Sequence, residues 1–276
     1  EFQGFEQAAD EPLLIVGMAI GISGLDLVNP SEMLGPALSP AVQIAVGIIL
    51  FEGALSLKRE ELGSGVRSAV TRLITLGVVI TWFVATVSIA LLLDVPHEMS
   101  ILIGATVIVS GPTVVIPILN FVGPTQKVRR VLKWEGILID PIGAIIAVVV
   151  FGSFDNGTGG EFDIGELFLS LGVGGLIGAA GAAVMIPILG TKRLAGRDKV
   201  AATLMMVVAA FAASDAVLSD SGLVATIVMG VVLANQHRVR VDQVAEFKET
   251  LVPILVGILF VLLDANVDMG QAIDLG

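Results

Sequence analysis

Hydrophobic runs of membrane-spanning length recur along the whole chain and are separated by short polar stretches. Nine segments can be distinguished, near residues 12–28, 38–57, 73–93, 99–121, 134–152, 167–190, 200–217, 222–235 and 249–264. Runs of about 20 apolar residues are typical of helices that cross a bilayer, whereas a membrane β-barrel would show alternating segments of about 10 residues. The pattern therefore predicts an all-α polytopic membrane protein, in which residues 1–276 form part of one transmembrane domain.

The charged residues between the segments are distributed asymmetrically. All 15 Lys and Arg lie between segments two and three, four and five, six and seven, or eight and nine, and the intervening connections carry acids instead. Because alternate connections of a multi-pass protein share one side of the bilayer, the bases gather on a single side. The positive-inside rule predicts that this side is cytoplasmic, and hence that the protein lies in the cell membrane.

Composition narrows the possible functions further. Only 15% of the residues are charged, against about 25% in soluble proteins. The net charge of −11, with bases confined to short clusters, argues against a nucleic-acid partner. The absence of cysteine excludes cysteine-based metal and redox sites, and no Gly-Lys-Ser/Thr phosphate-binding motif is present. We therefore expect no cofactor. The chain starts without Met and is expected to be a segment of a longer protein.

Segment four contains a predicted helix break, Ser110-Gly111-Pro112-Thr113, followed by Pro117. Proline lacks an N–H group and clashes with the carbonyl four residues back, so Pro112 and Pro117 each leave a backbone carbonyl without its helical partner. One interpretation is an ordinary proline kink. The other is a discontinuous helix whose free backbone groups contact an ion, as in secondary transporters.

Asp140 is the residue that most needs explanation, because it lies within a run of hydrocarbon side chains from Ile137 to Phe151. An acid at membrane depth costs roughly 2.5 to more than 10 kcal/mol and usually faces a cavity, a partner or an ion pathway. Pro141 follows directly and frees another carbonyl, so one turn offers hard oxygen ligands suited to Na⁺ or a proton. Glu135 lies some 140° around the helix from Asp140, and its neighbour Lys133 leaves open that Glu135 is an interfacial acid paired with a base.

Segment two contains a further acid, Glu52, six residues before Lys58. It is either an acid that reaches the cytoplasmic interface along its own stem or an acid that lines an ion path.

Segments four and five resemble the monovalent cation:proton antiporter family, specifically bacterial sodium/proton exchangers. The resemblance rests on Gly111-Pro112-Thr113-Val114-Val115-Ile116-Pro117 and on Lys133-Trp134-Glu135-Gly136-Ile137-Leu138-Ile139-Asp140-Pro141-Ile142-Gly143-Ala144. Further matches are Ile49-Leu50-Phe51-Glu52-Gly53, Ser221-Gly222-Leu223, Val228-Met229-Gly230, Leu233-Ala234-Asn235 and Glu246-Phe247-Lys248. Their order and spacing cover most of the chain.

The resemblance implies an inverted-repeat fold with a discontinuous helix, divided into a dimerisation domain and a moving core domain, and a homodimer. It implies that Asp140 binds Na⁺ and H⁺ in competition, and that Glu135 pairs with an arginine on a later helix. That helix is expected to lie outside this sequence. Many relatives carry Thr-Asp-Pro where this chain has Ser110-Gly111-Pro112, and a serine where it has Gly136. An Asn or Asp commonly precedes the essential Asp, whereas Ile139 does so here.

The combined prediction is a secondary antiporter and not an enzyme. Asp140 would exchange a proton for Na⁺, or for K⁺ or Li⁺, while the turn from Ser110 to Thr113 supplies backbone oxygens and Thr113 a hydroxyl. The partners would be these ions and the lipid bilayer. The alternative is a cation channel or a proton-coupled symporter on a similar scaffold. An intramembrane aspartyl protease is disfavoured, because it needs two converging aspartates and Asp140 is the only deep one.

Overall fold

The computed structural model describes residues 16, 19–21, 29–93, 95–155, 164–191, 196–219, 221–238 and 242–265. Within these residues the regular structure is helical, without strands, in agreement with the predicted fold class. The chain divides into two compact units, which are described separately. One comprises Glu1–Ile49 with Asp242–Gly276, and the other comprises Leu50–Val241.

The first unit contains α2 (Pro30–Leu34), most of α3 (Leu38–Leu55) and α12 (Asp242–Ala265). The Asn29 side chain caps α2 by accepting a hydrogen bond from the Glu32 amide at 3.2 Å. The predicted segment 12–28 lies almost wholly outside the described residues. Helix α3 continues into the second unit, where its last turn contributes to the site.

The second unit holds the other helices, which extend beyond several of the apolar segments. They are α4 (Ser64–Arg72), α5 (Val78–Leu92), α6 (His97–Val107), α7 (Pro112–Val122), α8 (Gln126–Asp155), α9 (Ile164–Gly190), α10 (Gly196–Val217) and α11 (Ser221–Asn235). A π-helical turn, Leu73–Gly77, joins α4 to α5. Helix α8 starts well before the apolar run, and its first turns are polar.

The predicted break in segment four separates α6 from α7. Helix α6 ends at Val107 and α7 begins at Pro112, the first helical position, where proline loses no hydrogen bond. Gly111 precedes it with φ −62° and ψ 143°, an extended conformation open to any residue. The break therefore does not need the conformational freedom of glycine at Gly111. Proline at N1, rather than glycine freedom, sets where α7 starts.

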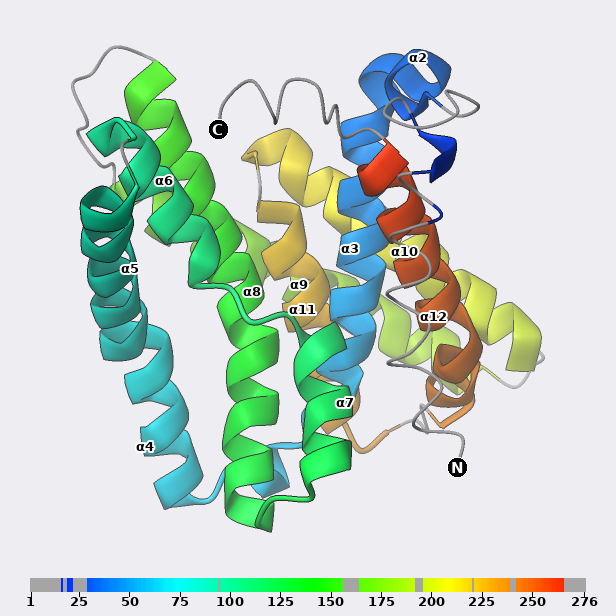
Figure 1. Ribbon diagram of the computed structural model, residues 1–276. Coiled ribbons are helices and arrows are strands. Elements are labelled where there is room, and N and C mark those ends of the chain that lie inside the picture. Colours follow the sequence, from blue (N-terminus) through cyan, green and yellow to red (C-terminus); the bar gives the residue numbers. More distant parts are fainter. Residues whose placement is uncertain are drawn as a thin grey trace. The chain divides into compact units, whose positions relative to one another are not determined.

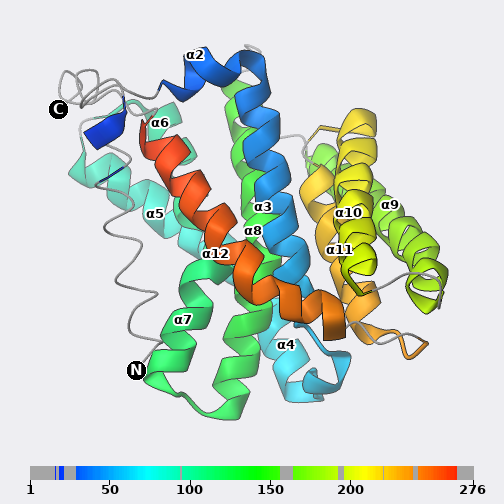
Figure 2. The same ribbon diagram turned by 90° about the vertical axis from the view of Figure 1, so that its right-hand side faces the viewer.

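Two groups of helices can be recognised within the second unit. Helix α5 packs on α6, while α4, α6 and α7 pack on α8; α9, α10 and α11 pack on one another. Figures 1 and 2 show α9, α10 and α11 side by side in both views. Helix α8 makes only minor contacts with α9 and α11. The helix that carries Asp140 is thus packed mainly with α4, α6 and α7.

Within the described residues, four helical stretches are long and apolar enough to cross a membrane. They are Pro30–Leu55, Gly65–Leu92, Phe168–Gly190 and Asp198–Val217, and shorter apolar helices lie at Ser221–Asn235 and Leu251–Leu263. The outward side chains of α5 are large and hydrophobic, with Phe83 68% and Leu91 80% exposed. Such a surface suits contact with lipid, where apolar groups need no burial in protein.

Candidate functional site

The chain between α6 and α7 crosses α8 and rests on two of its glycines (Figure 1). A Cβ at Gly136 would lie 3.4 Å from the Ser110 carbonyl oxygen and from Val115 Cγ2. Two turns further along nearly the same face of α8, a Cβ at Gly143 would overlap the Val109 side chain. The missing side chains therefore let the unwound backbone approach α8 closely.

Asp140 lies on the same face of α8 as Gly136, one helical turn further along. Residues four apart in a helix share a face, and their side chains lean toward the helix N-terminus. Asp140 is partly buried, and this geometry directs it toward the turn that contacts Ser110. The sequence elements predicted to form the ion site are thus brought to one place: a carboxylate on α8 and the unwound backbone before α7.

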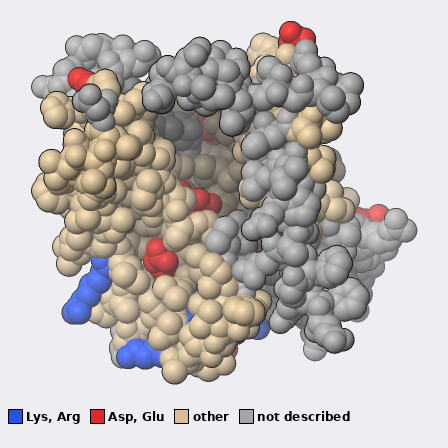
Figure 3. All heavy atoms as spheres, in the orientation of Figure 1, with Lys and Arg blue, Asp and Glu red and all other residues tan. Residues whose placement is uncertain are grey.

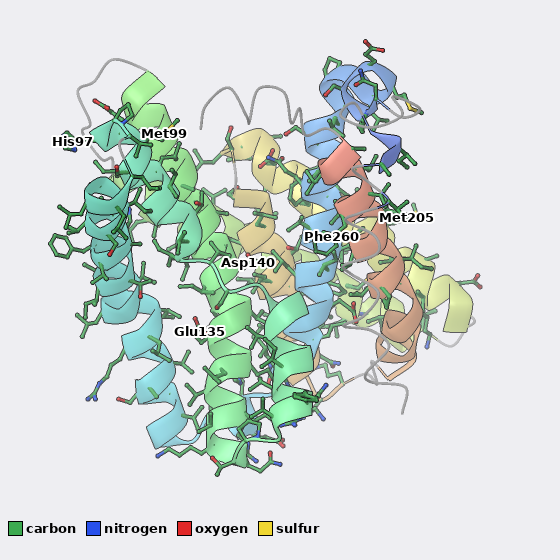
Figure 4. All side chains as sticks on the ribbon, viewed as in Figure 1. His97, Met99, Glu135, Asp140, Met205 and Phe260 are labelled. Carbon is green, nitrogen blue, oxygen red and sulfur yellow. The ribbon has the colours of Figure 1, made fainter. Side chains whose placement is uncertain are left out.

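Ser110 and Glu135 are joined directly. The Ser110 hydroxyl donates a hydrogen bond to Glu135 Oε1 at 3.2 Å, across 25 residues of sequence. Glu135 is therefore bonded to the helix break. The interpretation of Glu135 as an interfacial acid paired with Lys133 does not predict this bond. Figure 4 shows Glu135 and Asp140 on α8, and Figure 3 shows an acidic patch at each of these places, surrounded by uncharged atoms in the middle of the face.

An apolar cluster supports the break from the side of α5. Val78, Ile108 and Ile139 are buried together, and Ile74, Trp82 and Ile146 pack against them. The Trp82 indole N–H donates to the Ile101 carbonyl at 3.0 Å, which fixes α5 to α6. The end of α6 is thus held on α8 by packing at the level where the backbone unwinds.

Arg129 anchors the far end of α7 to α8. Its guanidinium donates to the Leu119 carbonyl at 2.9 Å and to Asn120 Oδ1 at 3.0 Å. Gly123 ends α7 with φ 58°, a left-handed conformation that favours glycine. A cation at a helix C-terminus also compensates the partial negative charge there. Helices α7 and α8 therefore form a hairpin tied at both ends, by Arg129 at one and by Ser110–Glu135 at the other.

Glu52 is buried in the last turn of α3, with 8% of its surface exposed. The next residue, Gly53, faces Ile137 of α8, with 3.6 Å between its Cβ position and Ile137 Cδ1. Asp140 is one turn beyond Ile137, so the same stretch of the α3–α8 contact carries both acids. The burial of Glu52 argues against the interpretation that its carboxylate reaches the interface.

Some predicted site residues cannot be placed in full. The side chains of Pro112, Thr113 and Pro117 lie outside the described residues, although their backbone belongs to α7. Pro141 is buried within α8. Among the side chains that are described, no group of three or more His, Asp or Glu residues is arranged to hold a metal ion.

Two contributions to the site were missed by the sequence reasoning. Gly136 was noted only as the replacement of a family serine, and Gly143 only as part of a motif, yet both form the surface on which the break rests. Their seven-residue spacing places them close to one face of α8. This spacing was the available signal.

Comparison with known protein families identifies the chain as follows. A model described as "Sodium/hydrogen exchanger, transmembrane" matches residues 12–274. The chain belongs to the sodium/hydrogen exchanger family. This confirms the resemblance seen in the motifs of segments four and five. The family consists of transporters, so the prediction that the protein is not an enzyme is confirmed as well.

Individual relatives agree with this assignment. The probable Na⁺/H⁺ antiporter 2 of Methanocaldococcus jannaschii is 24% identical over 276 residues, covering 94% of this chain and 64% of that protein. The structure of the sodium proton antiporter MjNhaP1 of the same organism at pH 8 is similar with a TM-score of 0.78 and 21% identity, covering 98% of this chain and 70% of that one. A structure of the same antiporter from an electron-microscopy map has a TM-score of 0.70, with 21% identity and coverage of 94% and 63%.

These structures confirm the all-helical membrane fold. The chain spans just under two thirds of the length of the curated relative that it matches. The family and the fold are thus established.

Proposed function

We propose that the protein is a secondary antiporter that exchanges a monovalent cation, Na⁺ in the first place, for protons across the membrane. The observation that carries this proposal is the unwound backbone at Ser110, packed on Gly136 directly beside the turn that holds Asp140. Free backbone groups at membrane depth are tolerated only where they are buried in protein or line an ion path. A carboxylate next to them completes a set of hard oxygen ligands.

Exchange follows from competition at Asp140. The carboxylate holds either a proton or a cation, since protonation removes the charge that attracts the cation. Loading from one side with Na⁺ and from the other with H⁺ then couples the two fluxes, provided that the site faces one side at a time. The relatives named as sodium/proton antiporters support this assignment of the ions.

Glu135 and Glu52 would act as supporting groups. Glu135, held by Ser110, fixes the distance between the break and α8, and buried Glu52 adds negative potential beside the path. The turn before α7 would contribute the Ser110 carbonyl, and Thr113 a hydroxyl. Asp140 alone changes its partner during the cycle in this scheme.

The orientation proposed from the charges has structural support. Figure 3 shows the basic side chains of this face along one edge, over the ends of α4, α7 and α8, away from Asp140. We assign this basic end to the cytoplasm of a cell membrane. A homodimer, expected from the family resemblance, completes the proposal.

The test is cation-dependent proton movement in everted vesicles that contain the full-length protein. Addition of Na⁺, K⁺ or Li⁺ should release protons from the vesicle interior, and a pH-sensitive dye reports this as recovered fluorescence. Asp140→Asn should abolish the signal. Cation entry without proton movement would instead support a channel.

A further inference from the structure

The backbone that follows α3 is hydrogen-bonded by side chains from two other helices. The Lys133 ammonium on α8 donates to the Ser56 carbonyl at 2.7 Å. The Asn235 amide at the end of α11 donates to the next carbonyl, Leu57, at 2.8 Å, and its Oδ1 accepts from the Arg59 amide at 2.6 Å. Two consecutive carbonyls are therefore held by helices that belong to different groups in the second unit.

The hydrogen bonds of Lys133 and of Asn235 lie in different surroundings. Around Asn235, α3 and α11 are in intimate contact, since a Cβ at Gly230 would lie 2.5 Å from the Phe51 carbonyl oxygen and 2.7 Å from Ala54 Cβ. Helix α8, in contrast, makes only minor contacts with α9 and α11 and packs mainly with α4, α6 and α7. Lys133 therefore links the helix group of α8 to the end of α3, while Asn235 links the end of α3 to α11.

The α3–α8 contact is filled by side chains between the levels of Asp140 and Lys133. Lys133 lies seven residues before Asp140, about 10 Å along the helix. Between them, Ile137 faces Gly53 and is 0% exposed, and Leu57 beside the Lys133–Ser56 bond is also 0% exposed. No route for a hydrated ion runs along this described α3–α8 contact. The Lys133–Ser56 bond is at its outer end, nearest the basic side.

We propose that Lys133 is a latch that keeps the α3–α8 contact closed in the conformation seen here, and that opening this contact toward the basic side requires the Lys133–Ser56 bond to break. This inference rests on the proposed function, because an antiporter must expose Asp140 to each side in turn. Asn235 keeps the end of α3 on α11 in both states, so the movement takes place between α8 and α3. A compact ammonium suits this role, since it is strongly hydrated and is readily rehydrated when it leaves the Ser56 carbonyl.

The test measures access to the closed layer directly, without relying on transport. The sequence contains no cysteine, so Ile137→Cys introduces the only thiol within it. In everted vesicles of the full-length protein, a membrane-impermeant maleimide reaches this thiol from the basic side only when the α3–α8 contact opens. Lys133→Met should raise the labelling rate about 10-fold, within the usual range of a conformational coupling. Lys133→Arg, which keeps a cation within reach of Ser56, should restore a slow rate.

Arg130→Met is the matched control, because Arg130 is an exposed base on the same helix. It should leave the labelling rate unchanged. Equal labelling in the Lys133→Met and parent proteins would overturn the latch, as would an equal increase in the Arg130→Met protein. The two proposals fail separately: a protein without cation–proton exchange refutes the function, whereas exchange that Asp140→Asn abolishes, together with unchanged labelling, refutes the latch alone.

Discussion

The close approach of the helix break to α8 predicts an energetic coupling between Gly143 and Val109. A methyl group at Gly143 would overlap the Val109 side chain. Replacing glycine by alanine within a helix gains about 0.8–1 kcal/mol, whereas overpacking costs about 1–3 kcal/mol. Gly143→Ala should therefore lower the stability by up to about 2 kcal/mol. Gly172→Ala on α9, where no atom lies within 4 Å of the new methyl group, should raise it by up to about 1 kcal/mol.

The assay is the thermal midpoint of the purified protein in detergent, followed by tryptophan fluorescence. For a protein of this size, 1 kcal/mol corresponds to a shift of about 2–4 °C, so Gly143→Ala and Gly172→Ala should move the midpoint in opposite directions. Val109→Ala removes the overlapping atoms, so the double variant should recover about 1–3 kcal/mol relative to the sum of the single changes. Additivity within about 0.5 kcal/mol would show that the two sites do not touch and would refute the placement of the break.

Three further predictions concern the hydrogen bonds around the site. Arg129→Gln should lower the thermal midpoint by several degrees because the Leu119 carbonyl and the Asn120 side chain lose their bonds to the guanidinium. Arg129→Lys should fall in between, and an unchanged midpoint in Arg129→Gln would contradict the anchor. Asn235→Ala should lower the folding stability by about 1–3 kcal/mol because the Leu57 carbonyl loses its donor. The thermal midpoint measures this as well, and a loss below about 0.5 kcal/mol would contradict a stabilising role of the Asn235 bond. Ser110→Ala should raise the apparent KM for the cation roughly fivefold, which corresponds to about 1 kcal/mol, with little change in maximal rate; an unchanged KM would show that the Ser110–Glu135 bond does not position the site.

Hydropathy and proline positions could predict the helices and the break, because these features depend on local chemistry. Burial of backbone in lipid forces helix formation wherever apolar residues continue for long enough. Pro112 marks the start of α7 because a residue without an N–H group fits only the first turn. The helix starts were less predictable, since α4 and α8 begin in charged sequence, where hydropathy carries no signal.

The arrangement around Asp140 depends on contacts between distant residues, which sequence patterns only partly encode. Ser110 and Glu135 were both proposed as site residues, but their hydrogen bond required the tertiary structure. The roles of Lys133 and Asn235 were hidden for a different reason. Their partners are the backbone carbonyls of Ser56 and Leu57, and a backbone acceptor has no residue type that a motif could reveal.

Dye-reported exchange by the full-length protein and its Asp140→Asn variant, in everted vesicles, tests the central claim most directly. Asp198→Asn is the matched control, because Asp198 is an exposed acid in the first turn of α10, away from the site. The account predicts that Na⁺ releases protons in the parent and Asp198→Asn proteins, and that Asp140→Asn gives no response at any Na⁺ concentration. Exchange that persists in Asp140→Asn would contradict the account and would shift the ion site to Glu52 or Glu135.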